Sequence, residues 1–133
     1  PNEALKVLKN LENSKNERIS KLKLEGYPSY TTSAGWLGYN NEKLKRLCHQ
    51  LKKSGFQYAK FKVGKNINDD IKRLEIIRKE LGDNFNIMID ANQVWEVDQA
   101  IDWIKKLSFS KPLFIEEPTN PLRSPITSLL SIS

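Results

Sequence analysis

The spacing of apolar side chains predicts alternating strands and helices over most of the chain. Runs with an apolar residue at every third or fourth position predict helices, and the short apolar runs between them predict strands. Asn41 and Asn68 are the expected N-caps of the first two of these helices, and the third begins at Val97. The predicted strands are residues 29–33, 57–63, 85–90 and 113–116.

This order of strand, helix, strand and helix is typical of βα units on a parallel sheet. Two short amphipathic helices, with a polar joint at residues 13–16, are predicted before it. After Pro121 the chain reads LRSPITSLLSIS, which has no capping signal and does not continue the alternation. We expect this last segment to be unstructured.

Two lysines in the predicted strand YAKFKVG raise the question of what their side chains face. Lys60 and Lys62 point to the same side, because side chains alternate along a strand. Taken alone, this pattern is typical of a strand at an exposed sheet edge. The next two predicted strands also end on charged residues, Asp90 in MIDANQ and Glu116 in FIEEP. Because spacings of 28 and 26 residues are one βα unit each, we expect these groups at the same end of neighbouring strands.

These residue types suit proton abstraction beside a bound metal ion. Carboxylates are hard oxygen ligands, which favour Mg²⁺. We expect the charge of Lys60 and removal from water to disfavour a second positive charge on Lys62, so that Lys62 can accept a proton. Each piece also has a plainer interpretation, since Asp90 can form a turn and Glu116 can end a strand at a solvated loop. Their coincidence at successive strand ends favours a functional site.

The motifs KFKVG, MIDANQ and FIEEPTNP, in this order and spacing, resemble the barrel of the mandelate racemase branch of the enolase superfamily. The segments GYPSYTTSAGWLGY, NDDIKRLEIIR and VDQAIDWIKKL are similar to its L-fuconate dehydratase group. The resemblance covers about residues 1–121 and implies an α/β fold, a partial (β/α)₈ barrel of about four βα units. It divides the chain into a helical connection from a missing capping domain (1–25), the first half of the barrel (26–121) and a divergent tail (122–133).

The resemblance also implies a role for each candidate site residue. Lys62 matches the base that removes the proton α to a carboxylate, and Lys60 matches the lysine that meets the substrate carboxylate. Asp90 and Glu116 match two of three carboxylates that hold one Mg²⁺, and Asn92 matches a position near the substrate. The implied reaction removes water from an acid sugar and yields a 2-keto-3-deoxy acid. We therefore expect a hydro-lyase of carbohydrate catabolism.

The sequence departs from the family pattern after the fourth predicted strand. A complete barrel has eight strands in about 250 residues. The third metal carboxylate, and the His–Asp pair that supplies a proton to the departing hydroxyl, have no counterpart in this sequence. His49 is expected on a helix surface and Cys48 in the core. We expect the chain alone to be inactive, and two alternatives remain: a non-catalytic half-barrel that self-associates or regulates a full-length enzyme, and another acid-sugar dehydratase of the superfamily.

Composition narrows the choice of partners. The formal net charge of +6 comes mostly from lysines spread over helical segments, so we expect no nucleic-acid partner. No apolar run reaches about 18 residues, so we expect no membrane span. One cysteine excludes an internal disulfide and fits a reducing compartment, mitochondrial or cytoplasmic. The expected partners are a small acid sugar and, through exposed barrel edges, further copies of the chain.

Overall fold

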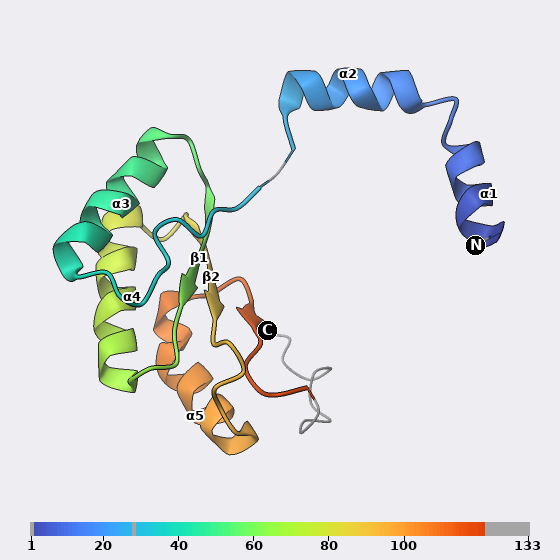
Figure 1. The fold of residues 1–133 in the computed structure, drawn as a ribbon. Coiled ribbons are helices and arrows are strands. Elements are labelled where there is room, and N and C mark those ends of the chain that lie inside the picture. The colour runs from blue at the N-terminus through green and yellow to red at the C-terminus, as the bar shows by residue number, and fades with distance from the viewer. Residues whose placement is uncertain (1, 28, 122–133) are drawn as a thin grey trace.

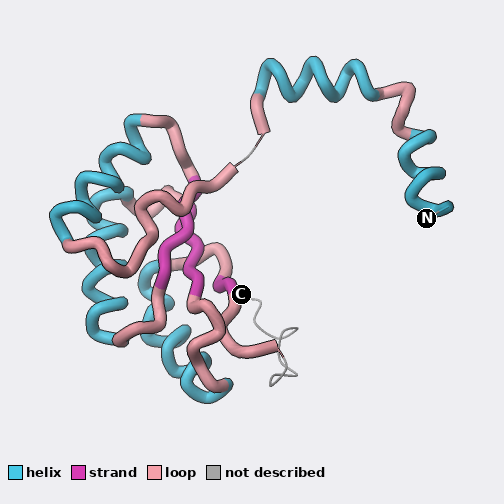
Figure 2. The backbone as a smooth tube through the Cα atoms, viewed as in Figure 1, coloured by secondary structure: helices cyan, strands magenta, loops and turns pink. Residues whose placement is uncertain are grey.

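The computed structural model describes residues 2–27 and 29–121. Three parallel strands form a sheet in the order β1 (Tyr58–Lys62), β2 (Asn86–Asp90) and β3 (Ile115–Glu116). The helices are α1 (Asn2–Asn10), α2 (Lys15–Glu25), α3 (Asn41–Lys53), α4 (Ile67–Leu81) and α5 (Val97–Leu107), followed by the short 3₁₀ helix η1 (Ser108–Ser110). The helices α3, α4 and α5 pack along the sheet (Figures 1 and 2).

The two faces of the sheet have different environments. Ala59 and Phe61 of β1, with Ile87 and Ile89 of β2, are buried and belong to the hydrophobic core. Since side chains alternate along a strand, the residues between them point to the opposite face, away from the helices. The helices contribute the other main members of the core, which are Leu44, Cys48, Leu51, Leu74, Ile77, Leu81, Ala100 and Leu107.

Three of the four predicted strands are confirmed, with slightly shorter bounds. The prediction of a strand at residues 29–33 is wrong, because only Thr31 forms a β-bridge, to Ala59. The Thr31 hydroxyl accepts a hydrogen bond from the backbone N–H of Ser33 at 3.2 Å. Local side-chain bonds of this kind compete with a strand ladder. The segment still lies along β1, because Lys60 donates its backbone N–H to the Thr31 carbonyl at 2.9 Å.

The predicted helices are confirmed, but two N-caps lie one or two residues earlier than expected. Asn40, rather than Asn41, caps α3 and accepts a hydrogen bond from the Lys43 backbone N–H at 2.9 Å. Asn66, rather than Asn68, caps α4. In both cases the earlier asparagine has an extended backbone, which allows its side-chain oxygen to reach back to the first helical turn.

The helices α1 and α2 are confirmed as elements and have no buried residue. They extend away from the sheet and its helices (Figure 1), and their apolar side chains, such as Leu5 and Leu8, are exposed. The division of the chain at residues 25 and 121 stays a prediction, and the predicted tail lies outside the described residues. Over the described part of the chain, no helix has the length and apolar character that crossing a membrane requires.

Arg78 joins three segments at the amino-terminal end of the sheet. Its guanidinium donates hydrogen bonds to four backbone carbonyls: Ser110 at 2.6 Å, Phe85 at 2.7 Å, and Gly82 and Lys111 at 3.0 Å. One side chain therefore satisfies the end of α4, the approach to β2 and the loop after η1. Charge-assisted bonds to four carbonyls, those of Ser110 and Phe85 partly buried, are costly to lose, because these acceptors are left without donors.

We predict that Arg78→Met lowers the free energy of unfolding by about 2–4 kcal/mol, because methionine keeps the apolar stem and removes every donor. Urea denaturation measures the change. Lys79→Met is the matched control, since Lys79 is the exposed neighbour on the same helix, and it is expected to change stability by less than about 0.5 kcal/mol. Equal losses in the two variants would contradict the role of Arg78.

Candidate active site at the carboxyl ends of the strands

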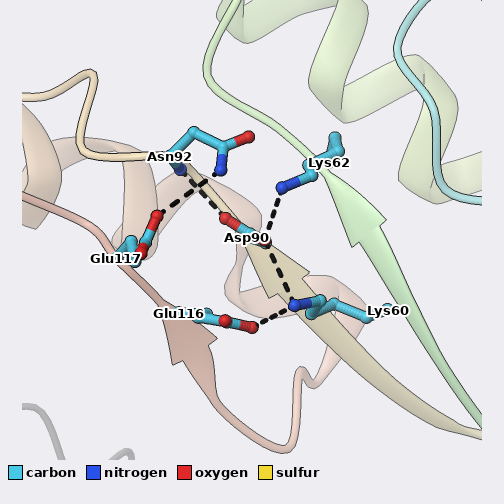
Figure 3. A network of polar contacts seen from close by, with 6 residues as sticks. All are labelled: Lys60, Lys62, Asp90, Asn92, Glu116 and Glu117. Carbon is cyan, nitrogen blue, oxygen red and sulfur yellow. Dashed lines mark hydrogen bonds and ion pairs between the residues drawn. The ribbon is translucent and has the colours of Figure 1, made fainter. Parts of the chain in front are cut away.

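The register of the parallel sheet brings the predicted charged residues into one row. Lys62 pairs with Asp90 across β1 and β2, and Asp90 pairs with Glu116 across β2 and β3. Lys60 lies two residues earlier on β1 and points to the same face. Figure 3 shows the four side chains converging at this end of the sheet. The structure therefore brings together all four charged residues that the sequence analysis selected.

Asp90 is the centre of a continuous ion-pair network. Its Oδ2 atom accepts from Lys62 Nζ at 2.6 Å and lies 3.2 Å from Lys60 Nζ. Lys60 also donates to Glu116 Oε2, so one ammonium group bridges carboxylates of two strands. Asp90 is 2 % exposed and Lys60 is 9 % exposed, whereas Lys62 and Glu116 are half-buried. β1 lies at one edge of the sheet, but Lys60 is not a solvated edge residue, because its side chain is buried and Thr31 bridges to Ala59 on the outer side of β1.

The network changes the proton affinity of two groups. Burial alone would raise the pKa of Asp90, but hydrogen bonds from Lys62, from the Asn92 backbone N–H and from Lys60 bring it below its ordinary value of 3.8. Burial likewise opposes the charge of Lys60, yet its hydrogen bonds to Glu116 and Asp90 raise the pKa of Lys60 above 10.5. Lys60 is therefore positively charged at neutral pH. The proton-accepting role expected of Lys62 stays a prediction.

Asn92 lies in a sharp turn directly after β2. Its backbone N–H donates to Asp90 Oδ1 at 3.0 Å, and its side chain donates to Glu117 Oε2 at 3.4 Å. Asn92 and Glu117 both have positive φ, 51° and 47°, which is uncommon outside glycine and concentrates at functional sites. Asp90 thus does form a turn after its strand, as the plainer interpretation held, while its role in a functional site stays a prediction. One carboxylate oxygen orients the turn, and the other faces the lysines.

Three further residues lie beside or outside this network. The ring of Tyr30 lies 5.5 Å from Lys60 Nζ, a cation–π contact that sequence reasoning missed. The aromatic character of GYPSYTTS was the available signal. His49 pairs with Glu80 on the helical side at 2.6 Å and takes no part in the network. Cys48 is fully buried, and burial raises the pKa of its thiol to about 11, as expected of a core residue rather than a nucleophile.

The donor set fits a hard divalent cation. Asp90 and Glu116 are adjacent across β2 and β3, and the Lys60 ammonium already contacts an oxygen of each. Their carboxylates can therefore converge on one positive charge. Mg²⁺ is commonly held by one or two carboxylates, with water and substrate oxygens completing its shell. Within residues 2–27 and 29–121, no cluster of three or more His, Cys, Asp or Glu side chains has metal-binding geometry.

Comparison with known proteins gives consistent results for sequence and fold. Residues 43–129 match the sequence profile of the family described as Enolase C-terminal domain-like. The chain is 49% identical over 119 residues to mitochondrial enolase superfamily member 1 from Xenopus laevis, a match that covers 90% of the chain. It is 48% identical over 124 residues to L-galactonate dehydratase from Hypocrea jecorina, covering 91% of the chain. These matches span only 27% and 28% of the two relatives.

Solved structures show the same relation. The crystal structure of human mitochondrial enolase superfamily member 1 superposes with a TM-score of 0.83 at 46% identity, over 90% of this chain and 27% of that one. L-talarate/galactarate dehydratase from Salmonella typhimurium, solved with Mg and L-lyxarohydroxamate, superposes with a TM-score of 0.65 at 36% identity. That superposition covers 68% of this chain and 24% of the dehydratase. The expected partial barrel is confirmed as the fold.

The lowered pKa of Asp90 predicts a loss of folding stability in acid. A carboxyl group whose pKa is lower in the folded than in the unfolded chain stabilises the fold above its unfolded pKa. That contribution is lost as the pH falls through the folded value. The difference in unfolding free energy between wild type and Asp90→Asn is therefore expected to shrink by on the order of 1 kcal/mol between about pH 6 and about pH 2.

Urea denaturation at each pH measures this difference. Asp70, which is fully buried and whose pKa burial raises, acts in the opposite sense but is present in both proteins, so its effect cancels. A difference that stays constant across this range would show that the folded chain does not depress the pKa of Asp90.

Proposed function

The chain belongs to the family of enolase C-terminal domain-like proteins, and on that basis we propose that it supplies the base, the carboxylate-binding lysine and two metal ligands of a magnesium-dependent acid-sugar dehydratase. The observation that carries the proposal is the convergence of Lys60, Lys62, Asp90 and Glu116 at one end of the parallel sheet. The proposed substrate is L-fuconate or a closely related sugar acid.

The names of the relatives support this reaction class. L-galactonate dehydratase and L-talarate/galactarate dehydratase are 48% and 37% identical to the chain over the matched residues. Structures of the latter were solved with Mg and the sugar acid L-glucarate. The chain spans about a quarter of the length of these relatives. The proposed activity of the whole protein therefore rests on the charged residues of the site, and the names of the relatives only support it.

In the proposed reaction, Lys62 acts as a neutral amine and takes the proton from the carbon α to the substrate carboxylate. Its Nζ lies 2.6 Å from Asp90, so the base stands directly beside the metal-binding carboxylates. Magnesium held by Asp90 and Glu116 would supply positive charge that stabilises the anionic oxygens of the reacting acid. The C–H electrons form a C=C bond as the β-hydroxyl departs with a proton as water. The enol that remains tautomerises to the 2-keto-3-deoxy acid.

The other residues of the site bind and orient the substrate. The buried Lys60 ammonium carries its charge throughout, which suits a hydrogen-bond donor to a carboxylate better than a base. Asn92 is exposed next to the network, and its backbone is held by Asp90, so its amide is placed to meet a substrate hydroxyl. Both roles need a side chain that stays in place while Lys62 exchanges its proton.

A second candidate function is that of a non-catalytic chain that self-associates through its sheet edges. Tyr30, beside β1, is 49% exposed, and Leu113 and Phe114, directly before β3, are 55% and 42% exposed. Apolar side chains at unpaired strand edges favour association between copies. Self-association requires no proton transfer by Lys62, whereas the dehydratase reaction does, so loss of the Lys62 side chain would affect only the dehydratase reaction.

We also propose a mitochondrial or cytoplasmic location. The name of the relatives called mitochondrial enolase superfamily member 1, from Xenopus laevis and Homo sapiens, supports the first of these two compartments.

We predict weak divalent-cation binding that depends on two carboxylates. The chain is expected to bind Mn²⁺, a spectroscopic substitute for Mg²⁺, with a Kd of about 1 mM, since two carboxylates leave most of the coordination shell to water. Asp90→Asn and Glu116→Gln should each raise this Kd at least about tenfold. Electron paramagnetic resonance of free Mn²⁺ measures the binding.

Glu117→Gln is the matched control for this measurement. Glu117 is the neighbouring carboxylate of the same motif, and it pairs with Asn92 rather than with the lysines. Its substitution should leave the Kd unchanged within about twofold. Loss of Mn²⁺ binding in Glu117→Gln, with Glu116→Gln unaffected, would contradict the assignment of the ligands.

We predict that this chain alone does not dehydrate L-fuconate in the presence of Mg²⁺, because a third metal carboxylate and an acid for the departing hydroxyl have no counterpart in its sequence. The measurement is the formation of 2-keto-3-deoxy acid, followed by its semicarbazone absorbance. Lys62→Ala serves as the control for contaminating enzymes. Turnover by the wild-type chain that Lys62→Ala abolishes would show that the prediction is wrong.

A further inference from the structure

Asp70 is a buried carboxylate on the helical side of β1, close to the charged row but not part of it. It lies in the first turn of α4 and is fully buried. Its Oδ2 atom accepts a hydrogen bond from the Gly64 backbone N–H at 2.7 Å and another from Trp103 Nε1 of α5 at 3.2 Å. Its Oδ1 atom is buried and, among the described residues, has no hydrogen-bond partner.

Gly64 is the point at which the chain leaves β1, two residues after Lys62. It has a φ of 107°, and a Cβ atom at this position would lie 2.6 Å from Val94 Cγ2. Only glycine allows this backbone conformation and this close approach. The preceding residue, Val63, donates its backbone N–H to the Asp90 carbonyl at 3.0 Å. The end of β1 is thus held by β2 on one side, by the loop after β2 on another and by Asp70 on a third.

Burying a carboxylate at this position costs desolvation free energy. Burial raises the pKa of Asp70, although the hydrogen bonds from Gly64 and Trp103 and the charge of Arg73 lower it in part. Arg73 forms no ion pair with Asp70, because its guanidinium donates to the carbonyls of Tyr39 and Trp36, each at 3.1 Å. An apolar residue would avoid the cost of desolvation but would leave the Gly64 N–H and the Trp103 Nε1–H without this acceptor. The acceptor is therefore better explained by what it holds than by a gain in stability.

We propose that Asp70 is a positioning residue for Lys62. By accepting from Gly64 and Trp103 with a single oxygen, it ties the backbone that follows Lys62 to α4 and α5 at once. This connection fixes where the end of β1 lies relative to β2, and hence the 2.6 Å contact between Lys62 Nζ and Asp90 Oδ2. The inference rests on the proposed function, in which Lys62 is the base, since a misplacement of about 1 Å in a catalytic group costs about 100-fold in rate.

The test measures the Lys62–Asp90 contact directly, by the NMR scalar coupling between Lys62 Nζ and the Asp90 side-chain carboxyl carbon. In Asp70→Leu, which keeps the branched shape of the side chain and removes the acceptor, we expect this coupling to fall at least about twofold. Arg78→Met is the matched control, because Arg78 also makes buried polar contacts on α4, at the opposite end of the sheet. It lowers stability and is expected to leave the coupling unchanged.

Asp70→Asn decides the matter if Asp70→Leu does not fold. Its amide oxygen can still accept from Gly64, and a downfield shift of the Gly64 amide proton reports that hydrogen bond. If the shift is kept in Asp70→Asn, the Lys62–Asp90 coupling should be kept; if the shift is lost, the coupling should be lost with it. Two results would overturn the proposal: an unchanged coupling in a variant that has lost the Gly64 hydrogen bond, or an equal loss in Arg78→Met. The readout needs neither Mg²⁺ nor substrate, so failure of the proposed function would be seen separately, in Mn²⁺ binding and turnover.

Discussion

The site depends on the parallel register that places Lys62 beside Asp90 and Asp90 beside Glu116. Because successive parallel strands end at the same edge, side chains about one βα unit apart in sequence come within hydrogen-bond distance. A shift of one residue in this pairing would move a whole row to the helical face, where the core excludes charge. The same register therefore directs the apolar side chains into the core and brings the four charged side chains together.

The charged row is balanced in itself, which bears on its chemistry. The row contains as many carboxylates as lysines, and the most buried of them, Asp90 and Lys60, contact each other. Mutual pairing reduces the cost of removing these groups from water. The balance also means that the row has no excess positive charge for an anionic sugar acid. This is a physical reason for including a divalent cation in the proposed function.

Two polar side chains of α4 hold the two ends of the sheet. Arg78 satisfies carbonyls at the amino-terminal end, and Asp70 accepts backbone and indole donors at the carboxyl end, near the site. Apart from Asp70 and Arg73, the buried residues of this helix are apolar. Loops that leave a sheet have backbone groups without strand partners, and a side chain from the covering helix can satisfy several of them. Stability and site geometry thus depend on the same helix.

The sequence by itself determined the alternation of elements and the identity of the charged row. Period-two and period-3.6 patterns are local, and the spacing of Lys62, Asp90 and Glu116 follows from the length of a βα unit. Their roles came from resemblance and remain proposals. Tertiary structure decided what depends on distant neighbours: that residues 29–33 form one bridge instead of a strand, that Tyr30 lies over Lys60, and that Asp70 is buried against α5. A helical first turn predicts a carboxylate, but not which face the packing of another helix will cover.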